Sequence, residues 1–578
     1  TIDFAKRYAK LAREKAATEK RADEKKRLEK LAEICDWVPE NPARTMHEAM
    51  QCYFFIHLIV GFIELPSVGC GIRLDKVMYP YYKKDLDEGR ITKAEALNLV
   101  ESVWIKFEEM GFIHPPRLFG SAGGGLAWQN VTLGGVDADG KDASNDISYM
   151  ILEATKELHS VQPPLCFRYH DKIPRALVLK AIETLRTGVA QPAFFNDKMM
   201  VPYLLEKGMP LADARDYGIS NCMSWVIPGK AMVYRQGMGM FSFTNCMMLA
   251  LNQGVDWLSG QKAGYPTPDP LSYKSIDEII EATMQQFNFY MEKEVYINNI
   301  ADALYQEYLP RPLISALSDE CIERGKDIRD YYYFHRNYVM PTGVNNVADS
   351  LAAIKKLVFE EKKITMSQLL DAMKKNFEGQ EELRQMLLSA PKFGNDDDYV
   401  DSIAEKVHFR ILEDTRKYTT YYGYPFDTDG TNASVGYFLG FDVAATPEGR
   451  KAREPLHDGT VSPVQGRDKK GPSAVLKSVG KVDPLLSNNH LFNQRFAPQF
   501  LDGENKEIFA DYLKTWSDLG IHHIQFNVID PDILKDAQKN PEKHADLIVR
   551  VAGYSAYFVD LTKTLQDDII ARTEQALG

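Results

Sequence analysis

The sequence predicts an α/β fold in which helices surround a barrel of strands, and this barrel encloses a site. Two observations predict it: helical periodicities recur along most of the chain, and isolated strand patterns are interspersed between them. The clearest strand lies near the end, where Ile524, Phe526 and Val528 alternate with polar Gln525 and Asn527. The 578 residues are enough for a large core, and no internal repeat or linker divides them.

The first part of the chain predicts surface helices. Residues 4–37 are highly charged, and their sparse apolar side chains, such as Tyr8 and Leu11, have the spacing of one helix face. Two further helices are expected to begin at capping-box patterns, at residues 45–48 and 92–95. The second continues with apolar residues on one face, which indicates packing against the core.

The rest of the chain alternates between loops and helices. Residues 114–147 are rich in Gly, Pro, Asn and Asp, which indicates loops and short strands. Helical patterns follow over residues 148–220, 276–308 and 350–420. A long loop is predicted over residues 442–474, which carry many prolines and glycines.

Composition excludes several classes of function. The net charge of −12 argues against nucleic acid or an anionic membrane as the main partner. The apolar run from Tyr53 to Leu65 is too short to cross a bilayer and predicts a core segment. Seven cysteines without a C-x-x-C pair indicate no disulfide framework, zinc site or iron–sulfur cluster, and free thiols suit a reducing cytoplasm. The start at Thr1, inside a helical pattern, indicates a fragment that lacks its N-terminal portion.

Gly553 is the residue on which the functional interpretation depends. Alone, the segment Arg550 to Tyr554 predicts no more than a turn or a helix cap. Glycine, however, is the residue that holds a stable backbone radical, because its planar Cα radical delocalises into both flanking peptide groups and meets no Cβ clash. Residues 549–558 resemble the C-terminal radical loop of glycyl radical enzymes, the pyruvate formate-lyase-like superfamily. Five other segments also resemble this family: residues 38–45, 79–82, 446–456, 471–479 and 523–528.

The resemblance implies a fold and a way of activation. The fold would be a barrel of two antiparallel half-barrels surrounded by helices, with a radical loop and a cysteine loop meeting inside. Residues 1–440 would form an N-terminally truncated barrel domain and residues 441–578 a C-terminal glycyl radical domain. A radical S-adenosylmethionine activating enzyme would install the radical on Gly553, so that no cofactor or metal need be bound.

The resemblance also implies that Cys222 is the thiol that Gly553 oxidises. A thiyl radical is a suitable relay because S–H and activated C–H bonds have comparable strengths, so hydrogen can move both ways. Pyruvate formate-lyase itself has two adjacent cysteines, whereas this chain has Asn221 before Cys222, which argues against acyl transfer. The cysteine position alone would otherwise predict inert core packing.

The residues around Cys222 favour one reaction within the family. Dehydratases and C–N or C–S lyases of the family place a glutamate two residues after the cysteine, where this chain has Ser224. A His-Ser pair of the dehydratases would fall at residues 67–68, which are Ser-Val here. Without these acid–base groups dehydration is not expected. The Cys-Met-Ser run instead resembles the benzylsuccinate and alkylsuccinate synthases, which add a hydrocarbon radical to fumarate.

Three residues are predicted to bind the substrate. Arg235 is the counterpart of an arginine that clamps a fumarate carboxylate, a role that suits the planar guanidinium. Ser224 follows the thiol, and Gln525 is expected to face the barrel interior, where a structural hydrogen bond near the radical loop is the other interpretation. Methionine and aromatic residues that follow Cys222 would line a hydrocarbon pocket or belong to the ordinary core: Met223, Trp225, Met232, Met238, Met240, Phe241, Phe243, Met247 and Met248.

Two alternatives stay open at this stage. One is another glycyl radical lyase, dehydratase or decarboxylase, or a pyruvate formate-lyase-like acyltransferase. The other is a catalytically silent fragment that acts as a binding or structural protein. For the enzyme, the expected partners are the activating enzyme and a small-molecule substrate together with fumarate, with room for a homodimer and small accessory subunits.

Overall fold

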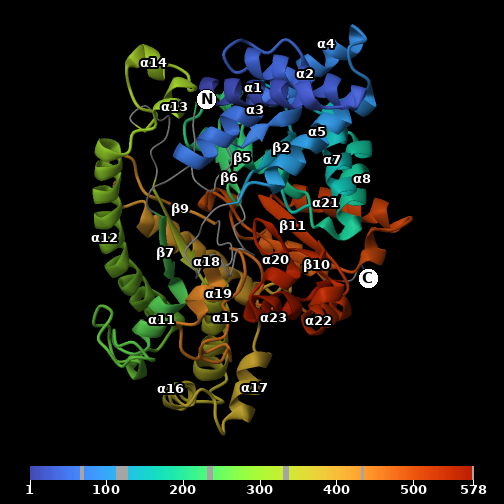
Figure 1. The fold of residues 1–578 in the computed structure, drawn as a ribbon. Helices are drawn as coiled ribbons and strands as arrows, with labels where there is room; N and C mark the ends of the chain where they lie inside the picture. Colours follow the sequence, from blue (N-terminus) through green and yellow to red (C-terminus); the bar gives the residue numbers. More distant parts are fainter. Residues whose placement is uncertain (65–70, 112–127, 231–237, 330–336, 431–434, 576–578) are drawn as a thin grey trace.

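The computed structural model arranges the chain as a central core of strands covered by helices (Figure 1). It describes residues 1–64, 71–111, 128–230, 238–329, 337–430 and 435–575. Arg235, Met232, the Ser-Val pair at residues 67–68 and residues 114–127 of the predicted loop region lie outside these ranges.

Two surface helices form the N-terminal part, as the charge pattern predicts. They are α1 (Ile2–Thr18) and α2 (Ala22–Trp37), which lie against one another along one edge of the molecule (Figure 1). The buried face of α1 is not the one predicted, because Tyr8 and Leu11 are exposed and a stripe of alanines is buried instead. Small alanine side chains permit close approach of the two helices, which larger side chains would prevent.

The next helices begin where the capping patterns predict. Thr45 caps α3 (Met46–Ile59) by accepting a hydrogen bond from the Glu48 amide, and Thr92 forms a complete capping box with Glu95 at the start of α5 (Lys93–Glu108). Helix α3 continues into the short π-helix η1 (Val60–Glu64), and together they are long and apolar enough to cross a membrane by length and composition. Helix α3 contacts α4 (Leu74–Asp87) and α5, and η1 contacts α13 (Pro312–Ala316), so this segment packs against other helices of the molecule.

A seven-stranded sheet forms the centre of the molecule. Its order is β1-β2-β3-β4-β11-β10-β14, with parallel pairing within β1–β4 and within β11, β10 and β14, and an antiparallel junction between β4 and β11. The two halves therefore run in opposite directions. The strands are β1 (Ile72–Arg73), β2 (Val131–Gly134), β3 (Leu165–Tyr169), β4 (Ala193–Asn196), β10 (Asn493–Phe496), β11 (His523–Val528) and β14 (Glu574–Gln575).

The uniformly helical prediction for residues 148–220 is wrong. Helices α7 (Asp146–Leu158), α8 (Arg175–Thr184), α9 (Asp197–Glu206) and α10 (Leu211–Arg215) do form, but β3 and β4 lie between them. Every residue of these two strands is buried. A strand buried on both faces shows no alternation of polar and apolar residues, so its pattern cannot be told from that of a buried helix.

A second, three-stranded parallel sheet stands beside the first. It consists of β7 (Met238–Ser242), β8 (Tyr338–Thr342) and β9 (Asp427–Thr428). The long helix α12 spans Ile276–Tyr308, as its periodicity predicts, and extends along one side of the molecule (Figure 1). Other helices of this part are α11 (Phe243–Ala250), α13 (Pro312–Ala316), α14 (Cys321–Arg324), α15 (Val344–Ile354), α16 (Met366–Lys374), α17 (Glu381–Ser389) and α18 (Asp398–Thr415).

The C-terminal part supplies one half of the large sheet, from β11 to the edge strand β14. After α19 (Val435–Gly440) no helix or strand forms until α20 (Pro472–Val479), which confirms the predicted long loop. The strand pattern at Ile524 to Val528 is confirmed as β11, which is buried along its whole length. The remaining elements are α21 (Asn505–Asp518), α22 (Pro531–Lys539), the hairpin of β12 (Ile548–Arg550) and β13 (Ser555–Tyr557), and α23 (Lys563–Ala571).

Candidate active site

Gly553 lies in the turn of the β12–β13 hairpin. Its φ of +79° belongs to the left-handed region that glycine reaches without strain. The hairpin residues on both sides, from Val549 to Ala556, are buried, so the turn is inside the molecule rather than on its surface. The turn alone is enough to explain a glycine at this position. Whether Gly553 also has a chemical role depends on the residues that contact it.

Cys222 lies at the tip of a second hairpin. Strands β5 (Gly218–Ser220) and β6 (Ser224–Val226) pair antiparallel, with Ser220 opposite Ser224, and Cys222 occupies the turn between them. Asn221 adopts a φ of +55°, which asparagine tolerates better than most residues. The Asn489 side-chain amide donates to the carbonyl of Met223 and holds the turn from the other side.

The tips of the two hairpins touch, which is the meeting of loops that the sequence predicts. A Cβ built on Gly553 would lie 2.5 Å from Cys222 Cβ and 3.1 Å from Cys222 Cα. Ala552 belongs to the same buried apolar cluster as Cys222 and Met223. The Gly553 Cα is thus packed directly against the cysteine, in a place where no other residue fits.

Polar side chains of β11 fix the radical loop. Gln525 Oε1 accepts from the Gly553 amide at 3.2 Å and from Arg550 Nε at 2.7 Å. Asn527 Oδ1 accepts from the Arg550 amide and Asn527 Nδ2 donates to the Arg550 carbonyl, both at 2.7 Å. The side chain of Asn527 therefore pairs with β12 as a neighbouring strand would.

The electrostatics keep the Cys222 thiol uncharged. Burial raises the pKa of the Cys222 thiol to about 12, although the nearby Arg550 guanidinium opposes this shift. Burial likewise lowers the pKa of Arg550 to about 10, which leaves it charged at neutral pH. Cys222 is therefore present as S–H and not as thiolate, a state suited to hydrogen-atom transfer and unsuited to nucleophilic attack.

A second thiol lies in the same neighbourhood. Cys166 in β3 is fully buried, accepts from Asn130 Nδ2 at 3.4 Å, and has a pKa that burial raises to about 12. It is close enough to Arg550 for the guanidinium charge to oppose that shift. Cys166 is therefore a buried residue in the wall of the same region.

A small cavity with polar and apolar walls lies beside the thiol loop, and no motif in the sequence indicates it. Its walls come from β8, α15, α18, the end of β9, the long loop before α20 and the segment after α20: Pro341, Val344, His408, Ile411, Thr428, Asp429, Thr460, Leu486, Ser487 and His490. The charge of Asp429 contributes to the raised pKa of Cys222, which places the carboxylate near the thiol. Asp429 lies 207 residues after Cys222, so only folding brings the two together.

The residues predicted to bind substrate are placed as follows. Gln525 is occupied by the radical loop, and Ser224 is buried in β6 directly after the thiol turn. Arg235 lies outside the described residues. Of the predicted hydrocarbon pocket, Met223, Trp225, Phe243, Met247 and Met248 are buried core residues, and Met240 is about half exposed.

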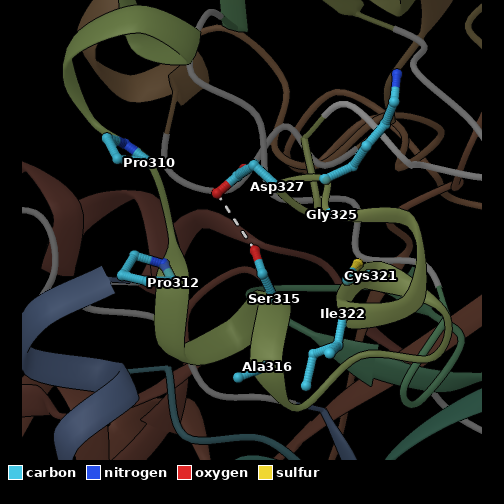
Figure 2. A pocket seen from close by; sticks show the side chains of 9 residues that line it. Pro310, Pro312, Ser315, Ala316, Cys321, Ile322, Gly325 and Asp327 are labelled. Carbon is cyan, nitrogen blue, oxygen red and sulfur yellow. Dashed lines mark hydrogen bonds between the residues drawn. The ribbon is translucent and has the colours of Figure 1, made fainter.

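Figure 2 shows a different hollow, between α13 and α14 near the surface. Asp327 faces it but already accepts from the Arg311 amide at 2.6 Å and from Ser315 Oγ at 3.2 Å. The Asp327 carboxylate is therefore engaged in holding the segment after α14 against α13. Within the described ranges, no group of three or more His, Cys, Asp or Glu side chains is arranged to hold a metal ion.

Comparison with known proteins gives matches along nearly the whole chain. The family model "Pyruvate formate lyase-like" matches residues 1–437, and the model "Glycine radical" matches residues 457–559. The chain is 35% identical to trans-4-hydroxy-L-proline dehydratase of Clostridioides difficile, over 99% of this chain and 73% of that protein. It is 37% identical to isethionate sulfite-lyase of Nitratidesulfovibrio vulgaris, over 99% and 70%.

The solved structures give the same result. The B12-independent glycerol dehydratase of Clostridium butyricum superposes with a TM-score of 0.94 at 38% identity, over 100% of this chain and 73% of that one. The predicted fold is confirmed by this likeness.

The predicted addition to fumarate is wrong. The relatives and structures at 35–38% identity are dehydratases and a C–S lyase rather than fumarate-adding enzymes, so the benzylsuccinate synthase type is not supported either. The error lies in the weight given to Ser224. A missing glutamate at one position of the thiol loop excludes an elimination only if no other carboxylate reaches the site, and that cannot be read from local sequence.

Proposed function

The chain belongs to the pyruvate formate lyase-like glycyl radical enzymes, which a radical S-adenosylmethionine enzyme activates, and from this premise we propose that it is a lyase acting on a small polar substrate. The reaction would be the elimination of water or another leaving group, as the names of the dehydratases and the sulfite-lyase indicate for those relatives. The observation that carries the proposal is the direct packing of Gly553 against Cys222.

Each residue of the pair has a defined role in this proposal. The Gly553 radical takes the hydrogen atom from Cys222 S–H, which leaves a thiyl radical and an intact glycine. The thiyl takes a hydrogen atom from a substrate carbon, the adjacent carbon loses its leaving group, and the product radical takes the hydrogen atom back from Cys222. Burial of both loops supports the proposal, because it keeps solvent and oxygen away from the radicals.

The test uses the protein after anaerobic treatment with its activating enzyme. We expect a glycyl doublet in electron paramagnetic resonance, and turnover of at least one of glycerol, 1,2-propanediol, trans-4-hydroxy-L-proline and isethionate. Cys222→Ser should keep the doublet and lose turnover by at least about 10⁴-fold, since the O–H bond is too strong to relay the hydrogen atom and removing a covalent participant costs this order of magnitude.

The matched control is Cys246→Ser, which alters another fully buried thiol, in α11. It should keep both the doublet and most of the turnover. Absence of a doublet in the wild-type protein would favour the catalytically silent alternative. A doublet without turnover of any of these polar compounds would contradict the proposed reaction.

A further inference from the structure

An elimination needs a group that moves protons, and the thiol loop does not contain one. Residues 218–226, which form the Cys222 hairpin, include no Asp, Glu, His or Lys. The leaving group departs with its bonding electron pair and must gain a proton, while a hydroxyl on the radical carbon must lose one. If the proposed reaction is right, another element must supply the group.

Asp429 is the one carboxylate among the described residues that line the cavity beside the thiol loop. It follows directly after β9, and its amide donates to the Val339 carbonyl of β8 at 2.8 Å, which extends the sheet pairing by one residue. Asn488 Nδ2 lies 3.4 Å from Asp429 Oδ1, and the next residue, Asn489, holds the Met223 carbonyl. One short segment therefore contacts both the carboxylate and the thiol turn.

A buried ring nitrogen in the same cavity lacks a partner. His490 is 1% exposed, and its Nε2 makes no hydrogen bond within the described part of the chain. Burial holds the pKa of His490 well below its ordinary value, so the ring is neutral. A buried polar atom without a partner is costly. Because His490 lines the cavity, a ligand bound there would supply the missing hydrogen-bond partner.

The other histidine of the cavity is already engaged. Burial lowers the pKa of His408 to about 3, and its Nε2 lies 3.4 Å from Asn345 Oδ1. The cavity thus offers a carboxylate, a neutral imidazole and the hydroxyls of Thr428, Thr460 and Ser487. Groups of this kind can hydrogen-bond the hydroxyls of a substrate.

From this arrangement we propose that Asp429 is the acid–base residue of the reaction and that His490 hydrogen-bonds the substrate. The inference rests on the proposed function. The substrate then carries a hydroxyl on the carbon that loses hydrogen to Cys222, and a leaving group on the next carbon.

The proton and the electrons balance in this step. Cys222 S–H forms as the substrate C–H breaks, and the Asp429 carboxylate takes the proton of the hydroxyl on the radical carbon. The leaving group on the neighbouring carbon departs with its electron pair, and Asp429 returns the proton to it. The remaining carbonyl-stabilised radical takes the hydrogen atom back from Cys222, so the net change is loss of HX from the substrate.

The test compares Asp429→Asn with the wild type on a substrate that the wild type turns over. Asparagine keeps the shape of the side chain, so the glycyl doublet should form in wild-type yield, while kcat falls about 10²- to 10⁴-fold, the usual contribution of acid–base catalysis. The matched control is Asp398→Asn, whose parent carboxylate is 91% exposed in α18, and which should keep wild-type kcat.

A second variant separates chemistry from packing. Asp429→Ala leaves space for a small acid, and added formate should restore its turnover at least about tenfold, whereas the full asparagine side chain should allow no such rescue. Asp429→Asn with near wild-type kcat would overturn the inference and leave the proposed function standing. Loss of the doublet together with turnover, without formate rescue, would also overturn it, since Asp429 would then be structural. No turnover of any polar substrate by the wild type would overturn both.

Discussion

Two separate features of the structure require glycine at position 553. The backbone has a φ of +79°, and the position of a Cβ is already occupied by Cys222. A positive φ is common among turn glycines, whereas close contact with a buried thiol is not. A glycine that only served the turn would not require contact with a buried thiol, so the close packing is what distinguishes a radical site from a turn.

We therefore expect Gly553→Ala to lower the free energy of unfolding by more than backbone strain alone would. Positive φ costs alanine about 1–2 kcal/mol, and overpacking against Cys222 adds about 1–3 kcal/mol. The control is Gly423→Ala, which has a φ of +84° but open space around its Cβ, and should lose only the first contribution. Denaturant unfolding of both variants measures the difference, and equal losses would show that the Cys222 contact is relaxed without cost. Gly553→Ala should also give no doublet after activation.

The contact between Gly553 and Cys222 could be predicted from the sequence, because each residue lies in a short segment that resembles family members. The carboxylate could not. Asp429 acquires its position through β9 and the loop after α20, and nothing in the residues around it indicates a cavity. Ser224 was misleading, because it shows only that the thiol loop has no glutamate there. An acid–base residue can come from any segment that reaches the site.

At the level of elements, β11 holds the radical loop in place. It is the strand at which the two halves of the sheet meet, and its polar side chains hydrogen-bond to β12. Its pattern was evident in the sequence because polar Gln525 and Asn527 alternate with apolar residues. Strands β3 and β4 lack that alternation, which is why they were hidden inside a predicted helical region.

Asn527→Ala should loosen the radical loop. It removes the hydrogen-bond partners of the Arg550 amide and of the Arg550 carbonyl. The carbonyl keeps a second donor, Arg572 Nη1 at 3.2 Å, but the amide loses its partner. Leaving a buried amide unpaired costs about 1–3 kcal/mol. We expect that loss in unfolding free energy and a smaller yield of glycyl radical. Asn505→Ala, which removes an exposed amide bonded to the Gln499 carbonyl, should change neither by a comparable amount.

The attachment of β14 should depend on pH through Asp468. This buried carboxyl accepts from Thr573 Oγ1 and Gln575 Nε2, and burial raises its pKa to about 6. The unfolded value is about 3.9, so the folded state holds the extra proton between about pH 4 and 6. The stabilisation is complete below about pH 4 and is lost as the pH rises through about 6.

Asp468→Asn should remove this dependence. The stability of the wild type relative to the variant is then expected to fall by about 1–3 kcal/mol from pH 4 to pH 7. Denaturant midpoints of both proteins at several pH values measure it. A constant difference across this range would show that Asp468 titrates alike in the folded and unfolded chains.

On the scale of the whole molecule, the C-terminal residues are part of the central sheet and not an appended tail. Strand β14 pairs with β10, and α23 packs against α22 in a buried cluster that also contains Tyr554 and Phe558. The residues that follow the radical loop thus pack in this sheet and in this buried cluster. Backbone cleavage at Gly553 would therefore divide a core, not release a flexible end.

Exposure of the activated protein to air tests this directly. Oxygen should add to the Gly553 radical and break the chain there, which leaves residues 554–578 as a separate peptide. Because that peptide contributes β13, α23 and β14, we expect it to stay bound, so that both pieces elute together in native size-exclusion chromatography and separate only in denaturant. Unactivated protein and Gly553→Ala should stay intact under the same exposure. Release of the peptide under native conditions would show that the covalent connection, and not the pairing of β14 with β10, holds the C-terminal part in the sheet.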